Sequence, residues 1–290
     1  MKADASCYLC CLKKTQSLLE QYKINSEEKI IISKRVCKFL ADVSQETSAP
    51  EILKNCIDIA NKYIDCNDAY AEKKYLYNKY LLDKEDKIIT QIVKHENPEI
   101  LALYYAVLGN YIDFGALDEV HTEQLEDLLQ TVNDINLDKK TVDKLFAQLL
   151  TAKNLVYITD NAGEIVLDKI FLKQLKSKYT DLNIKIIVRG EPILNDATIE
   201  DIKTIGLDKL FKIIPNGTNI PGTSLKHISA EALSCINNAD VIIAKGQGNF
   251  ETLRGCNKNI FYLFLCKCKL FTEKFGVRQF TAVIKNEFEF

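Results

Sequence analysis

Six short runs of β-branched and aromatic residues in the second half of the chain constrain its fold more than any other sequence feature. They lie at residues 154–159, 183–188, 211–214, 240–244, 260–265 and 280–285. Nearly continuous apolar runs of this length are typical of buried parallel strands. Because helical segments separate most of them, the pattern predicts right-handed βαβ units and an α/β fold. We expect a doubly wound sheet with helices on both faces.

The first half of the chain predicts helices. Apolar residues recur there at helical spacing in segments 6–22, 26–42, 50–64, 75–82, 98–108, 121–133 and 141–150. Ser26 is a candidate N-cap, and Pro50 suits the first turn of a helix. We therefore expect two parts: a helical domain over residues 1–150, and a Rossmann-like α/β/α domain over residues 151–290 that carries the site.

Composition and charge describe a folded protein without an evident charged partner. Hydrophobic residues make up 47% of the chain and charged residues 27%, which excludes a disordered or collagen-like protein. Lys and Arg number 38 against 40 Asp and Glu, and no block of like charge predicts binding to nucleic acid or a membrane surface. There is no apolar signal region, and the longest apolar run, 260–266, is too short for a membrane span. We expect a soluble, cytoplasmic protein.

Three loops that follow predicted strands carry residues suited to chemistry. Residues 159–164 read TDNAGE, residues 189–198 read RGEPILNDAT, and residues 245–250 read KGQGNF. The C-terminal ends of parallel strands lie at one edge of a sheet, and open α/β sheets bind their ligands beyond that edge. We therefore expect the three loops to converge.

Asp160, Asn161 and Asp196, in the first two loops, offer two carboxylates and an amide oxygen. These hard ligands suit Mg²⁺ or Mn²⁺. Lys245 adds a cation at the start of the third loop. A divalent metal with carboxylates, a lysine and glycine-rich backbone serves phosphoryl transfer or hydrolysis of a phosphate ester. The structural alternative is that Asp160 and Asp196 each cap the helix that follows.

Several sequence segments, spread in order over most of the chain, point to one family. They are 7–10 (CYLC), 109–115 (GNYIDFG), 160–164 (DNAGE), 189–190 with 195–198 (RG and NDAT), 221–223 (PGT), 245–251 (KGQGNFE) and 267–268 (KC). Together they resemble the metal-dependent damage-control phosphatases, formerly called domain of unknown function 89. The N-terminal Cys-x-x-Cys is similar to that of the family's microbial branch.

The resemblance implies a fold, an activity and a metal. Family members join a helical part to a Rossmann-like α/β/α part and hydrolyse phosphate esters of small metabolites, sugar phosphates among them. The family pattern places a divalent metal, Mn²⁺, Mg²⁺, Co²⁺ or Ni²⁺, on Asp160, Asn161 and Asp196 as the catalytic centre.

The same resemblance implies a phosphate site beside the metal. It assigns substrate phosphate to Lys245, Asn249 and Lys267. Asn110 and Asp113 match a Gly-Asn-x-Ile-Asp segment of the family, so the helical part is expected to contribute them to the same cleft. The alternative for this segment is an ordinary helix terminus at its glycine.

The ten cysteines are scattered along the chain, which favours free, mostly buried thiols over a disulfide framework. A zinc site on Cys7, Cys10, Cys266 and Cys268 is the alternative.

Two other functions stay open from the sequence. One is a Rossmann-like transferase that uses the cleft for a nucleotide or S-adenosylmethionine, although residues 246–248 carry only part of a dinucleotide fingerprint. The other is a non-enzymatic zinc or thiol module built on the four cysteines. His95, His121 and His227 have neither ligand spacing nor a nucleophile partner. The physiological substrate, the native metal and the oligomeric state stay open.

Overall fold

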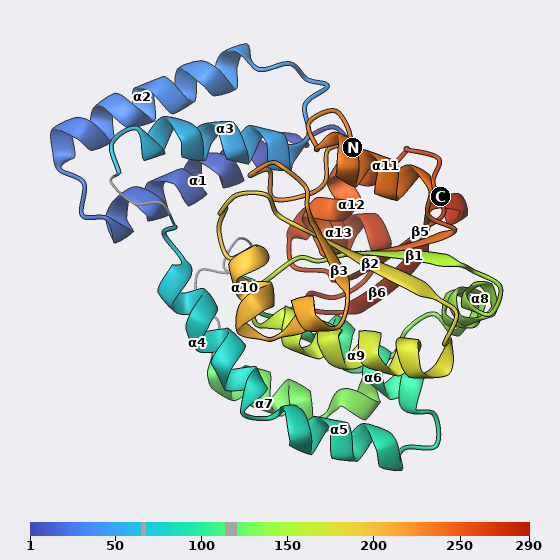
Figure 1. Ribbon diagram of the computed structural model, residues 1–290. Helices are drawn as coiled ribbons and strands as arrows, with labels where there is room; N and C mark the ends of the chain where they lie inside the picture. The colour runs from blue at the N-terminus through green and yellow to red at the C-terminus, as the bar shows by residue number, and fades with distance from the viewer. Residues whose placement is uncertain (65–67, 114–120) are drawn as a thin grey trace.

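A six-stranded sheet organises the computed structural model, which describes residues 1–64, 68–113 and 121–290 (Figure 1). The strands are β1 (Asn154–Ile158), β2 (Asn183–Val188), β3 (Lys212–Pro215), β4 (Val241–Lys245), β5 (Ile260–Leu265) and β6 (Ala282–Asn286). Their order is β3-β2-β1-β4-β5-β6, and β1 to β5 run parallel. The order reverses at β1, and such a switch point is where open parallel sheets bind ligands.

All six strands were predicted, but the last one differs in direction. β6 pairs antiparallel with β5, whereas a parallel strand was predicted. After α13 (Lys269–Phe275) the chain returns to the end of β5. There the Phe280 amide donates to the Cys266 carbonyl (2.7 Å), and the Cys266 amide donates to the Thr281 carbonyl (3.0 Å). A strand that begins beside the end of its neighbour runs back along it, so the sheet gains an antiparallel edge.

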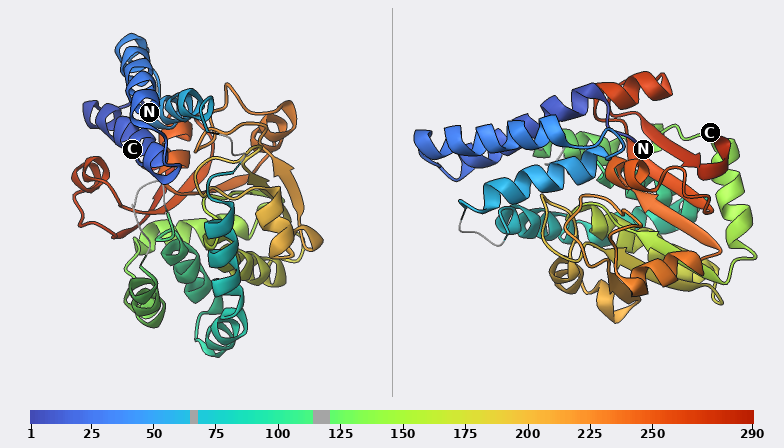
Figure 2. Two further views of the ribbon diagram at one scale, coloured as in Figure 1. Left: turned by 90° about the vertical axis from the view of Figure 1, so that its left-hand side faces the viewer. Right: turned by 90° about the horizontal axis from the view of Figure 1, so that it is seen from above.

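Helices cover both faces of the sheet, as predicted (Figure 2). Alternate residues of β1 enter different cores: Leu155 and Tyr157 face one, and Val156 and Ile158 face the other. The first core draws on α4 (Ala71–Leu82), α5 (Glu85–Lys94), α6 (Pro98–Gly109), α7 (Thr122–Gln130), α8 (Lys139–Leu149), α9 (Glu164–Lys178) and α10 (Ile199–Thr204). The second draws on α11 (Ala230–Asn237), α12 (Gln247–Leu253) and α13. The predicted α/β fold with a helical N-terminal part is confirmed.

The first three helices enclose a core of their own at one side of the molecule (Figure 1). They are α1 (Ala5–Gln21), α2 (Ser26–Asp42) and α3 (Ala49–Asn61). The N-cap of α2 is Asn25, whose side chain accepts a hydrogen bond from the Glu28 amide, and Ser26 is already inside the helix. Ile193 and Leu194, from the loop after β2, pack into this core. The first three helices therefore hold the loop that leads to Asp196.

The chain before residue 150 is helical where it is described, but it does not pack as one body. Helices α4 to α8 share a core with the sheet, whereas α1 to α3 have their own. The division into domains at residue 150 stays a prediction. Helix α5 was not singled out from the sequence. Across residues 1–64, 68–113 and 121–290, none of the helices has the length and apolar character to cross a membrane.

Ile193 tests the link between the first three helices and the loop. Its side chain is only 4% exposed, so Ile193→Ala leaves a cavity. We expect the free energy of unfolding to fall by about 2–5 kcal/mol in urea denaturation. Val93→Ala is the control, because Val93 on α5 is 65% exposed, and its effect should stay within about 0.5 kcal/mol. Equal effects of the two substitutions would show that Ile193 does not anchor the loop.

Candidate active site

The loops after β1 and β2 meet beyond the edge of the sheet, as their positions predicted. Asn161 and Asp196 form an isolated antiparallel bridge, although 35 positions separate them in the chain. Beside it, the Ala197 amide donates a hydrogen bond to the Asp160 carbonyl (2.7 Å). The structure thus brings Asp160, Asn161 and Asp196 together, and all three are buried. Their role as metal ligands stays a prediction.

Asp160 is held by two amides. Oδ2 of Asp160 accepts hydrogen bonds from Nδ2 of Asn161 (2.7 Å) and from Nδ2 of Asn110 (3.0 Å). Asn110 follows α6 and also accepts a hydrogen bond from the Leu265 amide through Oδ1 (3.1 Å). The helical part therefore reaches Asp160 through Asn110.

Neither Asp160 nor Asp196 caps the helix that follows it. The N-cap of α9 is Gly163, and the N-cap of α10 is Thr198. The capping alternative is therefore wrong for both aspartates.

Asp196 is paired with a buried arginine. Nε of Arg189 donates to Oδ2 of Asp196 (2.6 Å), and Nη2 of Arg189 lies 3.9 Å from Oδ1 of Asp160. The other guanidinium nitrogens donate to Thr223 Oγ1 and to Asn249 Oδ1, both at 3.3 Å. The arginine, fixed from several sides, sets the position of the Asp196 carboxylate.

Asn249 and Lys245, both predicted to bind phosphate, have protein partners in the structure. Nδ2 of the Asn249 side chain donates to the carbonyls of Thr159 (3.0 Å) and Lys245 (2.7 Å), and this side chain is fully buried. Nζ of Lys245 contacts Glu164 and Asp168, each at 2.6 Å, and is also fully buried. The phosphate roles of both residues stay predictions.

Lys267 and Asp113, predicted for the same cleft from the two parts of the chain, form an ion pair. Nζ of Lys267 lies 2.5 Å from Oδ2 of Asp113, and the lysine side chain is almost completely buried. The Lys267 amide donates to the Gln247 side chain (2.7 Å), which fixes the backbone at this point. Phe114 and Gly115, the end of the predicted GNYIDFG segment, lie outside the described residues.

Negative charge exceeds positive charge in this cluster. Its five carboxylates belong to Asp113, Asp160, Glu164, Asp168 and Asp196, and its three cations are Lys245, Lys267 and Arg189. Five minus three leaves two negative charges when all groups are ionised. Burial raises the pKa of Asp160 well above its usual value, and the neighbouring carboxylates, Glu164 first, raise it further. Burial also raises the pKa of Asp196 to about 6, although Arg189 opposes the shift.

The predicted ligands fit a divalent cation by charge and by donor type. Among the residues that the structure describes, no three His, Cys, Asp or Glu side chains form a ready-made metal site. The predicted set differs from such a group because Asn161 supplies an amide beside the two aspartates. Carboxylate and amide oxygens suit a hard cation such as Mg²⁺ or Mn²⁺, and a charge of two would balance the excess.

The glycines of the third loop accommodate protein groups. A Cβ added at Gly246, where φ is +80°, would lie 2.0 Å from Oδ2 of Asp160. One added at Gly248 would lie 2.2 Å from the Pro221 carbonyl. Both glycines therefore allow loops to approach one another, which explains them without a dinucleotide pyrophosphate.

Three buried charged residues of this cluster were given no role from the sequence. Glu164 and Asp168 lie one helical turn apart on α9, and together with Asp160 they repeat a carboxylate every four residues. That spacing places Glu164 and Asp168 on one face of α9, and this was the signal available from the sequence. Arg189 stood in a recognised segment, but its partner Asp196 could be identified only after the loop was folded.

The cysteines of the described residues are free thiols. Of the predicted zinc ligands, Cys266 is buried, Cys7 is half-buried, and Cys10 and Cys268 are exposed. Burial raises the pKa of Cys7 to about 11 and that of Cys266 to about 12, so both thiols are protonated near neutral pH. Of these four cysteines only Cys266 is fully buried, so the prediction of buried thiols fits that residue, and the zinc alternative stays a prediction.

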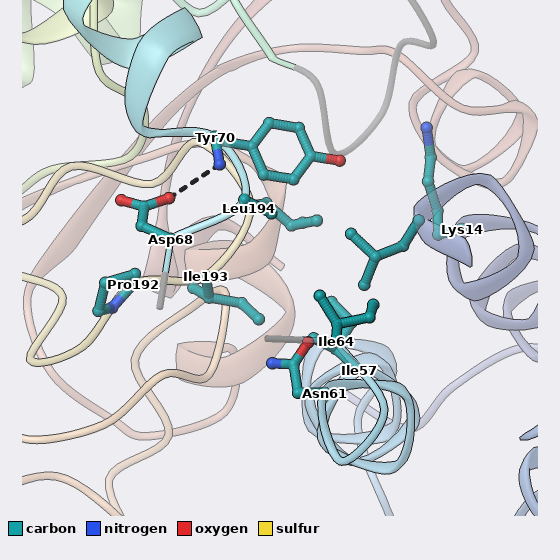
Figure 3. Close-up of a pocket in the computed structure, with 11 residues that line it drawn as sticks. Lys14, Ile57, Asn61, Ile64, Asp68, Tyr70, Pro192, Ile193 and Leu194 are labelled. Carbon is teal, nitrogen blue, oxygen red and sulfur yellow. Dashed lines mark hydrogen bonds between the residues drawn. The ribbon is translucent and has the colours of Figure 1, made fainter. Parts of the chain in front are cut away.

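A pocket lies between the first three helices and the loop that leads to Asp196 (Figure 3). Ile57 and Ile64 form one apolar wall, and Ile193 and Leu194 form the opposite one. Leu194 has a positive φ of 45°, a conformation that is uncommon for leucine. The pocket wall thus continues directly into Asn195 and Asp196.

Comparison with known proteins places this arrangement in a family. The sequence profile of the damage-control phosphatase ARMT1-like domain matches residues 3–283. The chain belongs to this family. A damage-control phosphatase of Pyrococcus horikoshii is 34% identical over the full length of both chains, and one of Archaeoglobus fulgidus is 28% identical over 98% of this chain and 99% of the relative. The predicted family and the predicted class of enzyme, a phosphatase, are confirmed.

A solved structure has the same fold. The crystal structure of a DUF89 family protein from Pyrococcus horikoshii superimposes with a TM-score of 0.85 at 32% identity and covers 99% of each chain. The similarity therefore includes the helical N-terminal part as well as the sheet.

Gly246→Ala tests the close packing at Asp160. The added Cβ would collide with the Asp160 carboxylate, so we expect Mn²⁺ affinity and phosphatase activity to fall together, by about tenfold or more. Gly255→Ala is the matched control, because Gly255 also has a positive φ (+91°) but no heavy atom within 4 Å of the added Cβ. Backbone strain at a positive φ should cost each variant about 1–2 kcal/mol of stability, and Gly246→Ala should lose more because of the collision. Calorimetric Mn²⁺ titration and thermal unfolding separate the two effects, and normal Mn²⁺ affinity in Gly246→Ala would contradict the prediction.

Proposed function

We propose that this protein is a phosphomonoester hydrolase that depends on a divalent metal and acts on small phosphorylated metabolites, sugar phosphates among them. Family membership and relatives named damage-control phosphatases support the phosphatase activity. The observation that carries the metal site is the buried bridge between Asn161 and Asp196 beside Asp160, within a cluster of excess negative charge. We place the enzyme in the cytoplasm, without a nucleic-acid or membrane partner.

Asp160, Asn161 and Asp196 would hold the metal, with Mn²⁺, Mg²⁺, Co²⁺ and Ni²⁺ as the ions to test. When bound, such an ion polarises a phosphoryl oxygen and lowers the pKa of a water ligand. The chain supplies the orientation of these groups. Arg189 fixes Asp196 through a 2.6 Å contact, and Asn110 fixes Asp160 through a 3.0 Å contact. Groups fixed in this way supply the preorganisation that catalysis requires.

Lys267 would bind the substrate phosphate. Its ammonium is paired with Asp113, and Asp113 in turn contributes to the raised pKa of Asp160, so the lysine lies beside the carboxylates. A lysine cannot ligate a cation, but it neutralises charge on phosphoryl oxygens as the leaving oxygen departs. In this arrangement the phosphate would exchange for Asp113 as the partner of Lys267.

Asp196→Asn tests the metal site. The substitution keeps an acceptor for Arg189 but removes a negative charge from the cluster. We expect Mn²⁺ affinity and p-nitrophenyl phosphate hydrolysis to fall together by about tenfold or more, with the fold intact. Calorimetry on metal-free protein and initial rates with each of the four ions measure the effect.

The control for this variant is Asp201→Asn. Asp201 is a buried carboxylate nearby in the chain and is paired with Lys74 at 2.9 Å. Its loss should lower stability without removing metal dependence. Full activity of Asp196→Asn at low metal concentration would refute the assignment.

Lys267→Ala tests the phosphate contact. At saturating metal we expect normal Mn²⁺ affinity but a loss of about tenfold to a thousandfold in kcat/KM, which corresponds to about 1.4–4 kcal/mol of transition-state stabilisation. Lys285→Ala is the control, because Lys285 is partly exposed on β6 and lies 3.9 Å from Asp138. If Lys267→Ala loses metal while substrate affinity is unchanged, the lysine supports the carboxylates instead.

A further inference from the structure

A continuous chain of buried polar side chains lies beneath the three predicted metal ligands. It begins at Asp168 on the second turn of α9, passes through Lys245 at the end of β4 to Glu164 at the start of α9, and ends at Asn161. Asp168, Lys245 and Glu164 have no exposed surface. The hydrogen bonds and ion pairs of these enclosed groups join them to one another and to Asn161.

Lys245 has three acceptors for its three ammonium hydrogens. Nζ lies 2.6 Å from Oε1 of Glu164, 2.6 Å from Oδ1 of Asp168 and 2.7 Å from the carbonyl of Ala106 on α6. Oδ1 of Asp168 also accepts a hydrogen bond from the Tyr157 hydroxyl (2.6 Å). A buried ammonium with this complete a set of partners has no hydrogen left for a phosphate. Its evident effect is to fix the Glu164 carboxylate.

Glu164 in turn fixes the amide of Asn161. Oε2 of Glu164 accepts hydrogen bonds from the Asn161 backbone amide (3.2 Å) and from Nδ2 of the Asn161 side chain (2.9 Å). The same Nδ2 donates to Oδ2 of Asp160 (2.7 Å). Both hydrogens of the Asn161 amide are therefore directed at carboxylates. A carboxamide held in this way can turn only its oxygen, Oδ1, towards a cation.

Glu164 also joins the helical part to the site. Nδ2 of Asn110 donates to Oε2 of Glu164 (3.0 Å) as well as to Oδ2 of Asp160 (3.0 Å). The two carboxylates are thus bridged by the same two amides, those of Asn110 and Asn161. Rotation of any one of the four groups would break hydrogen bonds to the others, so the orientation of the ligands is strongly specified.

We propose that Glu164, held by Lys245 and Asp168, is a positioning residue that presents Oδ1 of Asn161 to the metal. The proposal rests on the proposed metal-dependent function and assigns Lys245 to support of the ligands instead of phosphate binding. Partners that orient metal ligands from behind are commonly worth tenfold to a hundredfold in metal affinity. The arrangement also explains why an asparagine suits position 161, since a third carboxylate there would face Glu164 and Asp160 without a hydrogen to share.

Glu164→Gln is the principal test. Glutamine keeps the shape of the side chain, but its NH₂ group would face either the Lys245 ammonium or the amide hydrogens of Asn161 and Asn110. We expect the Mn²⁺ affinity of the metal-free protein, measured by calorimetry, to fall by about tenfold to a hundredfold. Inorganic phosphate should bind the Mn²⁺-saturated variant as it binds the wild type, because phosphate binding does not involve Glu164.

Lys169→Met is the matched control. Lys169 follows Asp168 on α9 and is also paired inside the protein, with Glu85 at 2.6 Å and the Ile205 carbonyl at 3.1 Å, and neither partner belongs to the charged cluster. This variant should lose stability and keep its Mn²⁺ affinity. If Glu164→Gln and Lys169→Met lower stability equally and both bind Mn²⁺ normally, Glu164 is only a structural residue and the proposal is wrong.

Coupling between Glu164 and Lys245 tests whether Lys245 supports the metal ligands instead of binding phosphate. The double variant Glu164→Gln/Lys245→Met removes one anion and one cation, so it keeps the charge balance of the buried cluster even if Lys245→Met alone does not fold. If the two residues act as one unit, the double variant should bind Mn²⁺ about as weakly as Glu164→Gln. A further loss of inorganic phosphate binding in the double variant, at saturating Mn²⁺, would return Lys245 to the role of a phosphate ligand.

These outcomes are distinguishable from failure of the proposed function. If the wild type does not bind Mn²⁺, or if Asp196→Asn binds it normally, the metal site itself is wrongly assigned. If the wild type and Asp196→Asn behave as expected while Glu164→Gln keeps full Mn²⁺ affinity, only the positioning role is overturned.

Discussion

The concentration of buried carboxylates beyond the ends of β1 and β2 is the constraint on which the rest of the structure depends. Carboxylates without partners are costly to bury, and like charges raise that cost. The fold offsets it with buried cations from separate segments: Arg189 after β2, Lys245 at the end of β4 and Lys267 after β5. Strands β1, β2, β4 and β5 thus each have a charged residue of the cluster at their C-terminal end or within two residues of it. With all of its carboxylates ionised the cluster keeps two excess negative charges, which a divalent cation would balance.

Close approach of the loops is the second requirement, and glycine meets it. Asp160 packs directly against Gly246, and a Cβ at Gly190 would lie 2.4 Å from the Gly217 amide nitrogen. The Asp160 carboxylate therefore lies against the backbone of the loop after β4, and the loops after β2 and β3 approach each other through backbone atoms. Such contact leaves little freedom for the carboxylates, since a shift of one loop moves the next. Rigid placement of this kind suits a site that must bind a metal with defined geometry.

Much of the fold follows from local sequence pattern, whereas the pairing of buried charges does not. Near-continuous apolar runs predicted the six strands. They are clearest in β1, β4 and β5, because a strand that is buried on both faces has no polar side. Convergence of Asn161 and Asp196 also followed, because parallel strands end at one edge. The direction of β6 did not follow, since it depends on where the chain after α13 returns.

The partners of Lys245 show most clearly what the sequence alone does not predict. Sequence gives a lysine after a buried strand, and a lysine there suits either phosphate or carboxylate. In the folded protein its acceptors include the Ala106 carbonyl, 139 positions away on α6, and Asp168, 77 positions away on α9. Only the packing of α6 and α9 against each other brings these acceptors to one point. The chemistry of this lysine is thus a property of the helix layer, and no local motif records it.

The helical part is therefore more than a cover for the sheet. Asn110 at the end of α6 bonds Asp160, Glu164 and the Leu265 amide, so one side chain connects the β1 loop, the start of α9 and the end of β5. Ile193 connects the first three helices with the loop of Asp196 in a comparable way, through apolar burial. The helices thus help to place both aspartates, Asp160 through Asn110 and Asp196 through the anchored Ile193. The proposed site thus draws on both parts of the chain, and the family match likewise extends over both, from residue 3 to residue 283.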